Sequence, residues 1–334
     1  MPSYLTATVT EVLVERPGLQ RVATSEGRAY ALTALTGSVA VGDEVVLNTT
    51  AVELGLGTGG WHVVHWNLTR RQWHAPGGGH IVKLRYTSLQ ADTGSAEEHH
   101  PELGTDLGGM PVVACTVHSQ VAVVAAVVRQ LRPAARITFV MTDGAALPIV
   151  ISDLVHALRQ GGVLDATVTA GHAFGGEHEA VTVASALTVA RHLTGADVVV
   201  AGMGPGVVGT ASMLGTTAVD AATVLDAAAA LGAVPILAVR ASEGDARPRH
   251  QGISHHVAGV LSLTHATIHL PLPALLAGAL PGATVVDPLP DVAAVLVAAG
   301  AHVTTMGRGP DEDPLFYAAA AAAGALAAGL VGGA

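Results

Sequence analysis

Residues 197–210 read DVVVAGMGPGVVGT, and this stretch decides the fold. It begins with an apolar run at 198–201 and then breaks into a series of glycines. An Ala/Leu-rich segment that is compatible with a long helix follows. This order predicts a buried strand, a glycine turn and a helix directly after the turn. Such a turn aims main-chain N–H groups at whatever lies beyond the end of the strand.

The glycine turn has three interpretations. Gly204, Gly206 and Gly209 match the G-x-G-x-x-G spacing of dinucleotide-binding turns, and Thr210 adds a hydroxyl. A dinucleotide site also needs an acidic residue about 20 residues further on, where this chain is still in its Ala-rich segment, so a nicotinamide cofactor is not expected. A cradle for a phosphate or carboxylate needs only N–H groups at a helix start. Close packing of the helix on the strand needs only the glycines.

The composition narrows the classes of partner. Only 13% of the 334 residues are charged, against about 25% in typical soluble proteins, which predicts a partly covered surface and a homodimer. The formal charge is -10 and no run of Lys or Arg occurs, so we expect neither nucleic acid nor an anionic membrane as a partner. The single cysteine, Cys115, lies in an apolar run and is expected to be a buried hydrophobe.

The two ends of the chain do not resemble targeting segments. The N-terminus has no basic start and carries Glu11 and Glu15, unlike a signal peptide. Residues 315–334 are uncharged and as long as a membrane span, but they are mostly Ala and Gly. We expect them to form a buried or interface helix, and we expect a cytoplasmic protein.

The first part of the chain predicts β-structure. Short segments rich in Val and Thr alternate with turn signals, and they occupy residues 6–14, 21–24, 29–32, 44–48 and 61–66. This number of strands in so few residues is typical of a small closed or nearly closed barrel. The alternation at residues 81–90 predicts one more strand. We therefore expect a barrel-like domain over residues 1–90 and a linker over residues 91–109.

From residue 110 onward the pattern alternates between strands and helices. The expected strands are apolar throughout, at residues 112–117, 137–141, 166–170, 198–201 and 236–239. The expected helices between them include residues 121–131, 149–159 and 179–192. Such strands indicate a parallel sheet that is covered on both faces. The predicted fold class is α/β: a small N-terminal β-barrel domain and, over residues 110–334, a Rossmann-like, mostly parallel, three-layer α/β domain.

Ligands of such sheets bind outside the carboxyl ends of the strands. The residues that follow these ends are small, polar or ionisable. We therefore expect one site there, to which the strand exits contribute the glycine turn and His118, Ser119, Asp143 and Glu177.

The densest polar stretch follows the strand at 236–239 and reads SEGDARPRHQGISHH at residues 242–256. Arg247 and Arg249 are fork-shaped donors for a phosphate or carboxylate, and His250 beside them is suited to proton transfer. A second chemistry uses the same segment as a metal site. The candidate ligands of a divalent ion such as Zn²⁺ or Mn²⁺ are Asp245, His250, His255 and His256.

Four segments carry a resemblance to a known family: KLRYTSLQ at 83–90, FGGEHEAV at 174–181, GPGVVGT at 204–210 and RPRHQGISHH at 247–256. The chain resembles an uncharacterised bacterial family, common in actinobacteria, that is known only as a domain of unknown function. The resemblance covers nearly the whole chain. It implies a β-rich N-terminal part joined to a Rossmann-like domain, and it implies no activity.

The sequence favours an enzyme of hydrolase or transferase type that acts on a small phosphorylated or carboxylated substrate. In this hypothesis the glycine turn holds the anionic group, Arg247 and Arg249 clamp it, and His250 transfers a proton. Asp143 or Glu177 orients His250 or activates water. Two alternatives stay open: a regulatory protein that binds a nucleotide or metabolite without turnover, and a purely structural dimer.

Overall fold

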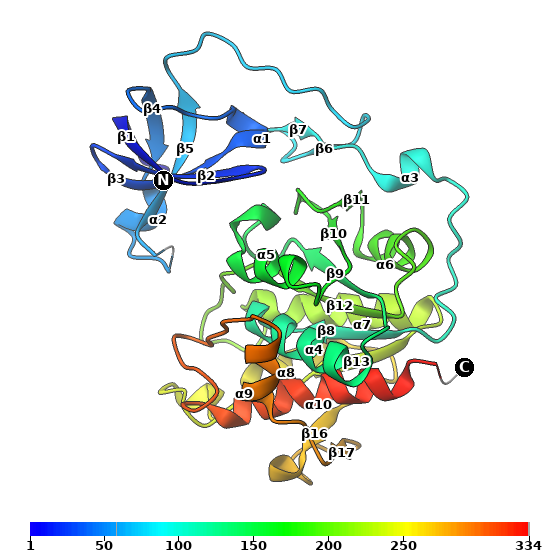
Figure 1. Cartoon of the computed structure of the whole chain (residues 1–334). Coiled ribbons are helices and arrows are strands. Elements are labelled where there is room, and N and C mark those ends of the chain that lie inside the picture. Colours follow the sequence, from blue (N-terminus) through cyan, green and yellow to red (C-terminus); the bar gives the residue numbers. More distant parts are fainter. Residues whose placement is uncertain (58, 333–334) are drawn as a thin grey trace. The chain divides into compact units, whose positions relative to one another are not determined.

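The protein divides into two compact units, Met1–Asp92 and Thr93–Ala334, in a computed structural model that describes residues 1–57 and 59–332 (Figure 1). Residues 93–109, which the sequence suggested as part of a linker, belong to the second unit. Within them, α3 (Ala96–His99) is fastened to the rest of that unit by Glu97, which accepts a 3.3 Å hydrogen bond from the amide of Val181.

The first unit is a closed barrel with the strand order β1-β2-β3-β5-β4, so the predicted small closed barrel is confirmed. The long strand β1 pairs with both β2 and β4, and its two register shifts let one strand bend around the barrel. The core is aliphatic and includes Val9, Val22 and Leu47. The elements are β1 (Tyr4–Arg16), β2 (Leu19–Thr24), β3 (Gly27–Leu32), α1 (Thr33–Thr36), β4 (Glu44–Asn48), α2 (Thr50–Glu53) and β5 (Trp61–Asn67).

The prediction of one strand over residues 81–90 is wrong. The chain forms two short antiparallel strands instead, β6 (Val82–Lys83) and β7 (Ala91–Asp92). It turns back between them, where Leu84 and Tyr86 have positive φ values of 53° and 62°. The alternating side chains indicated extended structure, but they carried no signal for this reversal.

The second unit is built on a six-stranded sheet in which every neighbouring pair is parallel. Its order is β11-β10-β9-β12-β8-β13, so β12, the strand of the glycine turn, lies between β9 and β8. This is not the 3-2-1-4-5-6 order of dinucleotide-binding sheets. The strands are β8 (Pro111–Cys115), β9 (Ile137–Thr142), β10 (Ala166–Ala170), β11 (His178–Ala180), β12 (Val198–Met203) and β13 (Val234–Ala238). The sequence predicted five of them, and it placed the edge strand β11 in a helix.

Helices cover both faces of this sheet. On β8, Val113 and Cys115 point into a core shared with α4, α9 and α10, while Val112 and Ala114 point into a core shared with α6, α7 and α8. Because successive side chains of a strand alternate between faces, apolar residues throughout the strand supply both cores. The helices are α4 (His118–Leu131), α5 (Asp153–Gln160), α6 (Val183–His192), α7 (Ala221–Ala230), α8 (His255–Leu263), α9 (Val292–Ala298) and α10 (Pro314–Leu330).

Shorter elements complete the second unit. They are the 3₁₀ turns η1 (Ile149–Ile151), η2 (Thr217–Asp220), η3 (Pro248–His250) and η4 (Ala274–Leu276), and the two-stranded pairs β14 (Ala241–Ser242) with β15 (Gly252–Ile253) and β16 (Pro271–Pro273) with β17 (Thr284–Val286).

The Ala-rich C-terminal segment forms α10, which packs closely along α4 (Figure 1). Within residues 1–57 and 59–332, no helix combines the length and apolar character that crossing a membrane requires. The close packing depends on Gly324, where an added Cβ would lie 2.8 Å from the carbonyl oxygen of Val124 and 3.0 Å from the Cβ of Val127.

Two glycines of α10 give a matched test of this packing. We expect Gly324→Ala to lower the free energy of unfolding by about 1–3 kcal/mol, because the backbone of α4 cannot move away cheaply. Gly329→Ala, in the same helix with nothing within 4 Å of the added Cβ, should raise it by about 0.5–1 kcal/mol. Urea unfolding of both variants measures the difference. Equal effects of the two substitutions would contradict the packing argument.

Candidate functional site

The carboxyl ends of the parallel strands lie at one edge of the sheet, and the exits of β8 and β13 are tied together there. The side chain of Gln120, in the first turn of α4, accepts from the amides of Thr116 and Val117 and donates to the carbonyl of Ala238 at 2.9 Å. The residues that follow these two neighbouring strands are therefore held in one region.

His118 begins α4 and is held from both sides. Its Nδ1 lies 2.9 Å from the carbonyl oxygen of Met203, at the end of β12, and its Nε2 lies 2.7 Å from the hydroxyl of Ser152. Burial lowers the pKa of His118 to about 4, against a weaker raising effect of the Met203 bond. The imidazole is therefore neutral at pH 7. Ser119 is partly exposed in the same helical turn.

Asp143 follows β9 and contacts the segment that follows β10. Its carboxylate accepts a 3.0 Å hydrogen bond from the amide of His172. Burial, and then the charge of Asp143, raise the pKa of Asp220. A Cβ at Gly144 would lie 2.3 Å from a carboxylate oxygen of Asp220, which explains the glycine there.

The helix predicted directly after the glycine turn begins later. Residues 204–216 form a loop that closes on itself, with the Thr210 amide donating to the Gly215 carbonyl at 2.7 Å and the Thr217 amide donating to the Val208 carbonyl at 2.8 Å. Helical structure starts only at η2 and α7. The prediction of a helix start at the turn is wrong because these local hydrogen bonds compete with a helix.

The glycines of this loop allow close approach. A Cβ at Gly204 would lie 2.2 Å from the Ala146 carbonyl oxygen, and one at Gly209 would lie 2.9 Å from the Thr216 hydroxyl. At Gly206, by contrast, nothing lies within 4 Å, but φ is 92°. The Thr210 hydroxyl bonds within the loop, to Ser212 and Gly215. Close packing therefore accounts for two of the three glycines, and an anion cradle here would use loop amides without a helix start.

Glu177 does not reach His250. It forms an ion pair with Arg159 and accepts from the amide of Thr167, near the start of β10. It directly precedes β11, and β11 and β13 are the two outermost strands of the sheet, about 24 Å apart at the usual strand spacing. The predicted pairing of Glu177 with His250 is thus not formed, because the edge strand β11 carries Glu177 away.

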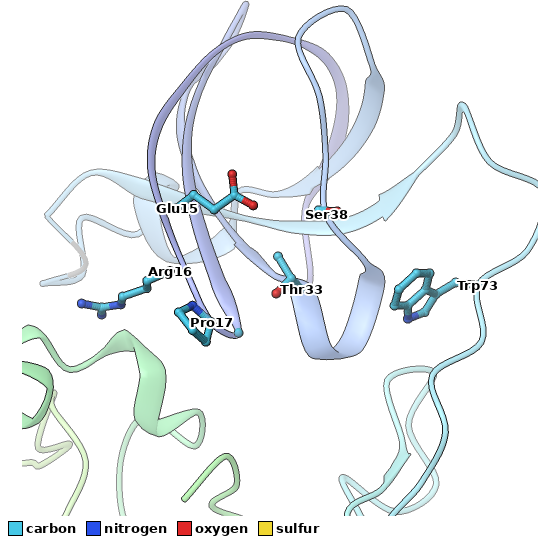
Figure 2. A pocket seen from close by; sticks show the side chains of 7 residues that line it. Glu15, Arg16, Pro17, Thr33, Ser38 and Trp73 are labelled. Atoms are coloured by element: carbon cyan, nitrogen blue, oxygen red, sulfur yellow. The ribbon is translucent and has the colours of Figure 1, made fainter. Parts of the chain in front are cut away.

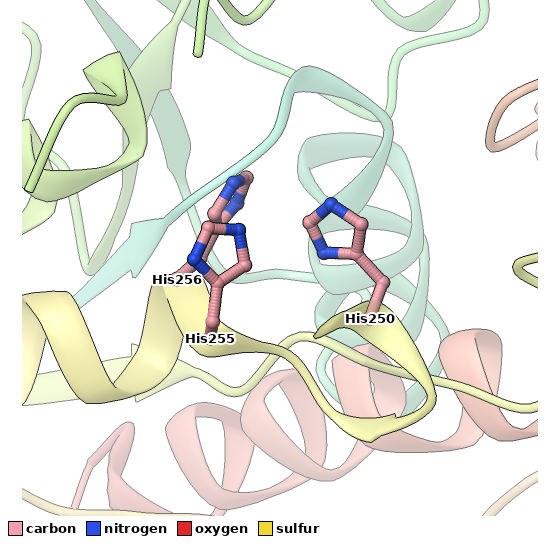
Figure 3. Close-up of side chains that lie close together, drawn as sticks. All are labelled: His250, His255 and His256. Atoms are coloured by element: carbon pink, nitrogen blue, oxygen red, sulfur yellow. The ribbon is translucent and has the colours of Figure 1, made fainter. Parts of the chain in front are cut away.

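Three histidines of the 242–256 segment do come together (Figure 3). His250 ends η3, whereas His255 and His256 begin α8, and Figure 3 shows the His250 ring facing the other two. The ring centroids lie 4.7–5.0 Å apart. The hydroxyl of Ser254, which caps α8, lies 2.7 Å from Nδ1 of His250. Nε2 of His255 is buried and has no hydrogen-bond partner within the described chain.

Arginines surround these imidazoles. Nη1 of the buried Arg240 donates to Nδ1 of His256 at 2.9 Å, and Nε2 of His256 lies 3.4 Å from the Thr216 hydroxyl, so this ring also contacts the glycine loop. Burial, and then the charge of Arg240, lower the pKa values of His250 to about 4 and of His256 to about 3. Both rings are therefore neutral at pH 7.

Two buried carboxylates offset the arginines. Asp245 accepts from Nε and Nη2 of Arg247 at 2.9 and 2.7 Å, and these bonds hold its pKa well below the usual range. Arg240 and Arg308 approach the same carboxylate at 3.7 and 3.6 Å. Asp313, at the start of α10, binds Arg308 and the hydroxyl of Ser242. Although burial raises the pKa of Asp313, these bonds and two main-chain amides outweigh it and lower the pKa.

A metal ion would have to use the three histidines without Asp245. One nitrogen from each ring lies within 4.8 Å of the others, a spacing that could close onto a Zn²⁺ ion. However, His256 accepts from Arg240 at Nδ1 and so carries its proton on Nε2. It can ligate an ion only after Arg240 withdraws. The arginines make the cluster better suited to an anion than to a cation.

Arg247 and Arg249 differ in availability. Arg249 is exposed and acts on His255 through its charge. Two of the guanidinium nitrogens of Arg247 are already engaged by Asp245, and the side chain is 36% exposed. In the predicted clamp, the guanidinium group of Arg249 is therefore available to a ligand, whereas that of Arg247 is only partly available.

The sequence prediction omitted several residues that build this region: Ser152, Arg240, Arg308 and Asp313. The sequence could have predicted Arg240, because this residue directly follows the apolar run that forms β13. It could not have predicted Arg308 and Asp313, since they reach the cluster from the chain segment before α10, more than 50 positions further on.

The barrel carries a separate pocket of about 530 Å³ (Figure 2). Its lining includes the indole of Trp73 and the charged side chains of Glu15 and Arg16, with Pro17, Gly18, Thr33 and Ser38. The guanidinium of Arg70 lies 5.3 Å from the Trp73 ring. None of the site residues predicted from the sequence contributes to this lining.

The fold and the edge cluster define an α/β protein with an N-terminal barrel and a cluster of polar side chains at the carboxyl edge of its six-stranded sheet. The chain belongs to the family described as "Protein of unknown function (DUF3866)", whose model matches residues 28–324. The predicted resemblance to a family of unknown function is thereby confirmed. No curated protein and no solved structure matches the chain.

The neutral histidines make stability depend on pH. In the unfolded chain their pKa values return to about 6.5, so between pH 6.5 and pH 4 the unfolded state binds more protons than the folded state. We expect the free energy of unfolding to fall as the pH falls through this window, by about 1.4 kcal/mol for each pKa unit of a fully shifted group. Chemical unfolding at pH 7.0, 5.5 and 4.5 measures the slope.

His118→Asn should flatten this slope, because it removes one of the shifted groups. An unfolding free energy that stays constant from pH 7.0 to pH 4.5 would contradict the neutral, buried state of these rings.

Proposed function

We propose that this protein is a hydrolase or transferase that acts on a small phosphorylated or carboxylated molecule at the carboxyl edge of the six-stranded sheet. One observation carries the proposal. The chain after β13 gathers three imidazoles and the buried Arg240 in direct contact with one another. Clustered cationic and imidazole groups of this kind bind anions and move protons.

The charges of the cluster favour an anionic ligand. Arg240, Arg247 and Arg308 face two buried carboxylates, Asp245 and Asp313, which leaves a surplus of positive charge beside the rings. That surplus, after burial, lowers the pKa of His250 and His256. A bound anion compensates it and, by the same effect, raises the affinity of the rings for protons.

Each residue has a role in the proposal. Arg249 and the open part of Arg247 bind the anionic group. His250 transfers a proton, and the Ser254 hydroxyl holds its ring in place, which takes over the orienting role that the sequence suggested for Asp143 or Glu177. Asp143 and the loop with Gly204 and Gly206 follow β9 and β12 at the same edge of the sheet, and they are proposed to contact the rest of the substrate.

The assembly is part of the proposal. A chain with so few charged residues supports a homodimer, and the exposed apolar side chains of Val208, Met213 and Leu214 in the glycine loop are candidates for the covered surface. The Rossmann-like classification likewise stays a prediction.

Binding of inorganic phosphate tests the anion site. We expect isothermal titration calorimetry to detect phosphate binding to the full chain, and we expect Arg249→Ala to weaken it about tenfold, which corresponds to about 1.4 kcal/mol. The matched control is Arg132→Ala, which removes another exposed arginine at the end of α4, and its affinity should equal that of the unchanged protein.

Turnover separates the enzyme from the regulatory alternative. A panel of nucleotides, sugar phosphates and small dicarboxylic esters, first ranked by thermal shift, is assayed for product. We expect His250→Asn to reduce turnover of the best substrate by about 10²–10⁴-fold while its binding changes little. Ligands that bind at the arginines and are never consumed would favour the regulatory protein. Equal phosphate affinities of the Arg249 variant and its control would refute the anion site.

A further inference from the structure

A second chemical feature of the sheet edge is the hydrogen-bonded pair of His118 and Ser152. Because the Met203 carbonyl can only accept, the proton of the neutral His118 ring must sit on Nδ1, 2.9 Å from that oxygen. Nε2 then presents a lone pair to the Ser152 hydroxyl at 2.7 Å, so the hydroxyl donates to Nε2. This arrangement has the three parts of an activated nucleophile: a hydroxyl, a base, and an acceptor that fixes the tautomer of the base.

We propose that Ser152 is a nucleophile that His118 activates, and that this pair transfers the acyl group of a small ester. The proposal deepens the proposed hydrolase or transferase function and rests on it for the location of the substrate. It assigns the bond-breaking step to the exits of β8 and β9. The anionic group of the substrate stays with the arginines after β13, and the proton that His250 transfers goes to that group.

The chemistry balances with the groups present. The Ser152 oxygen attacks the carbonyl carbon and forms the new C–O bond, while its proton passes to Nε2 of His118. The tetrahedral intermediate then expels the alcohol, which takes that proton from Nε2. Water, deprotonated by the same nitrogen, hydrolyses the acyl-serine and restores the hydroxyl; another alcohol in place of water gives a transferase.

The surroundings favour an uncharged carbonyl group. The His118 ring packs edge-on against Phe139, with centroids 6.0 Å apart, and the carbonyl that holds it immediately precedes the glycine loop. In the proposal, main-chain N–H groups of that loop stabilise the oxyanion of the tetrahedral intermediate. Ser152 itself is only 3% exposed, so the acyl group must be small.

The pair also has a structural role, which the test must separate from catalysis. The Ser152 hydroxyl accepts from the amide of Val155 and caps α5, so Ser152→Ala would weaken the helix as well as remove the nucleophile. Ser152→Asn avoids this difficulty, because asparagine is an equally good cap and its amide can donate to His118. It cannot form an acyl-enzyme. His118→Asn likewise keeps a donor for the Met203 carbonyl and removes the base.

The experiment exposes the full-length protein to a small fluorophosphonate and, separately, to p-nitrophenyl acetate. Peptide mass spectrometry should find the phosphonyl group on Ser152, and the acetate should give a burst of one nitrophenol per chain. Ser152→Asn should show neither, and His118→Asn should slow both by about 10²-fold or more. Ser185→Ala, which alters a surface serine in the first turn of α6, should behave as the unchanged protein.

An unchanged protein that is not labelled at Ser152, or a Ser152→Asn variant that retains the burst, overturns the proposal. The result is independent of phosphate binding, since p-nitrophenyl acetate carries no anionic group. Labelling of Ser152 without any phosphate affinity would refute the anionic substrate and support the nucleophile. Phosphate affinity without labelling would support the anion site and refute the nucleophile.

Discussion

The parallel pairing of β9, β12, β8 and β13 is the constraint on which the rest of the second unit depends. Parallel strands end at the same edge, so each connection that leaves a strand must start beside the connections of its neighbours. That rule brings His118, Asp143, the glycine loop and Arg240 to one edge, although they are spread over residues 118–240 of the sequence. The side chain of Gln120 then links two of these exits directly.

A network of ion pairs and hydrogen bonds holds the chain segment after β13 in place. Burying Arg240, and partly burying Arg247 and Arg308, is costly unless carboxylates and hydrogen bonds replace their hydration. Asp245 meets this need from within the same segment, and Asp313 meets it from the start of α10. The network therefore couples the orientation of the histidines to the packing of the C-terminal helix, and removal of either carboxylate would leave uncompensated positive charge beside the rings.

The sequence predicted those features that depend on local patterns. Apolar runs located five of the six central strands, and alternating short segments located the closed barrel. It did not predict the late start of the helix after the glycine loop, because the hydrogen bonds of Thr210 and Thr217 with their own loop decide that boundary. It also grouped Glu177 with His250, since a list of strand exits does not reveal which strands are outermost in the sheet.

For the candidate site, residues in one continuous segment were predictable and residues contributed by distant segments were not. The histidines at 250, 255 and 256 stand close in sequence, so their composition alone singled them out, and the structure brings their rings together. Ser152 fell inside the helix predicted over residues 149–159, and nothing in the sequence singled it out. Its contact with His118 exists only because the turn after β9 packs against the start of α4, a contact that neither segment encodes by itself.

The two groups of side chains at the edge differ in charge, and this difference suggests how one substrate would contact both. The pair of His118 and Ser152 is neutral and lies against an aromatic ring, whereas the histidine cluster is surrounded by arginines. The glycine loop connects both: Met203, directly before it, binds His118, and Thr216, at its end, lies beside His256. A molecule with an uncharged reactive bond at one end and an anionic group at the other would match this gradient. Because one loop connects both groups, a movement of the loop on binding at the arginines would also alter the carbonyl that orients His118, which gives the two ends of the edge a physical means of acting together.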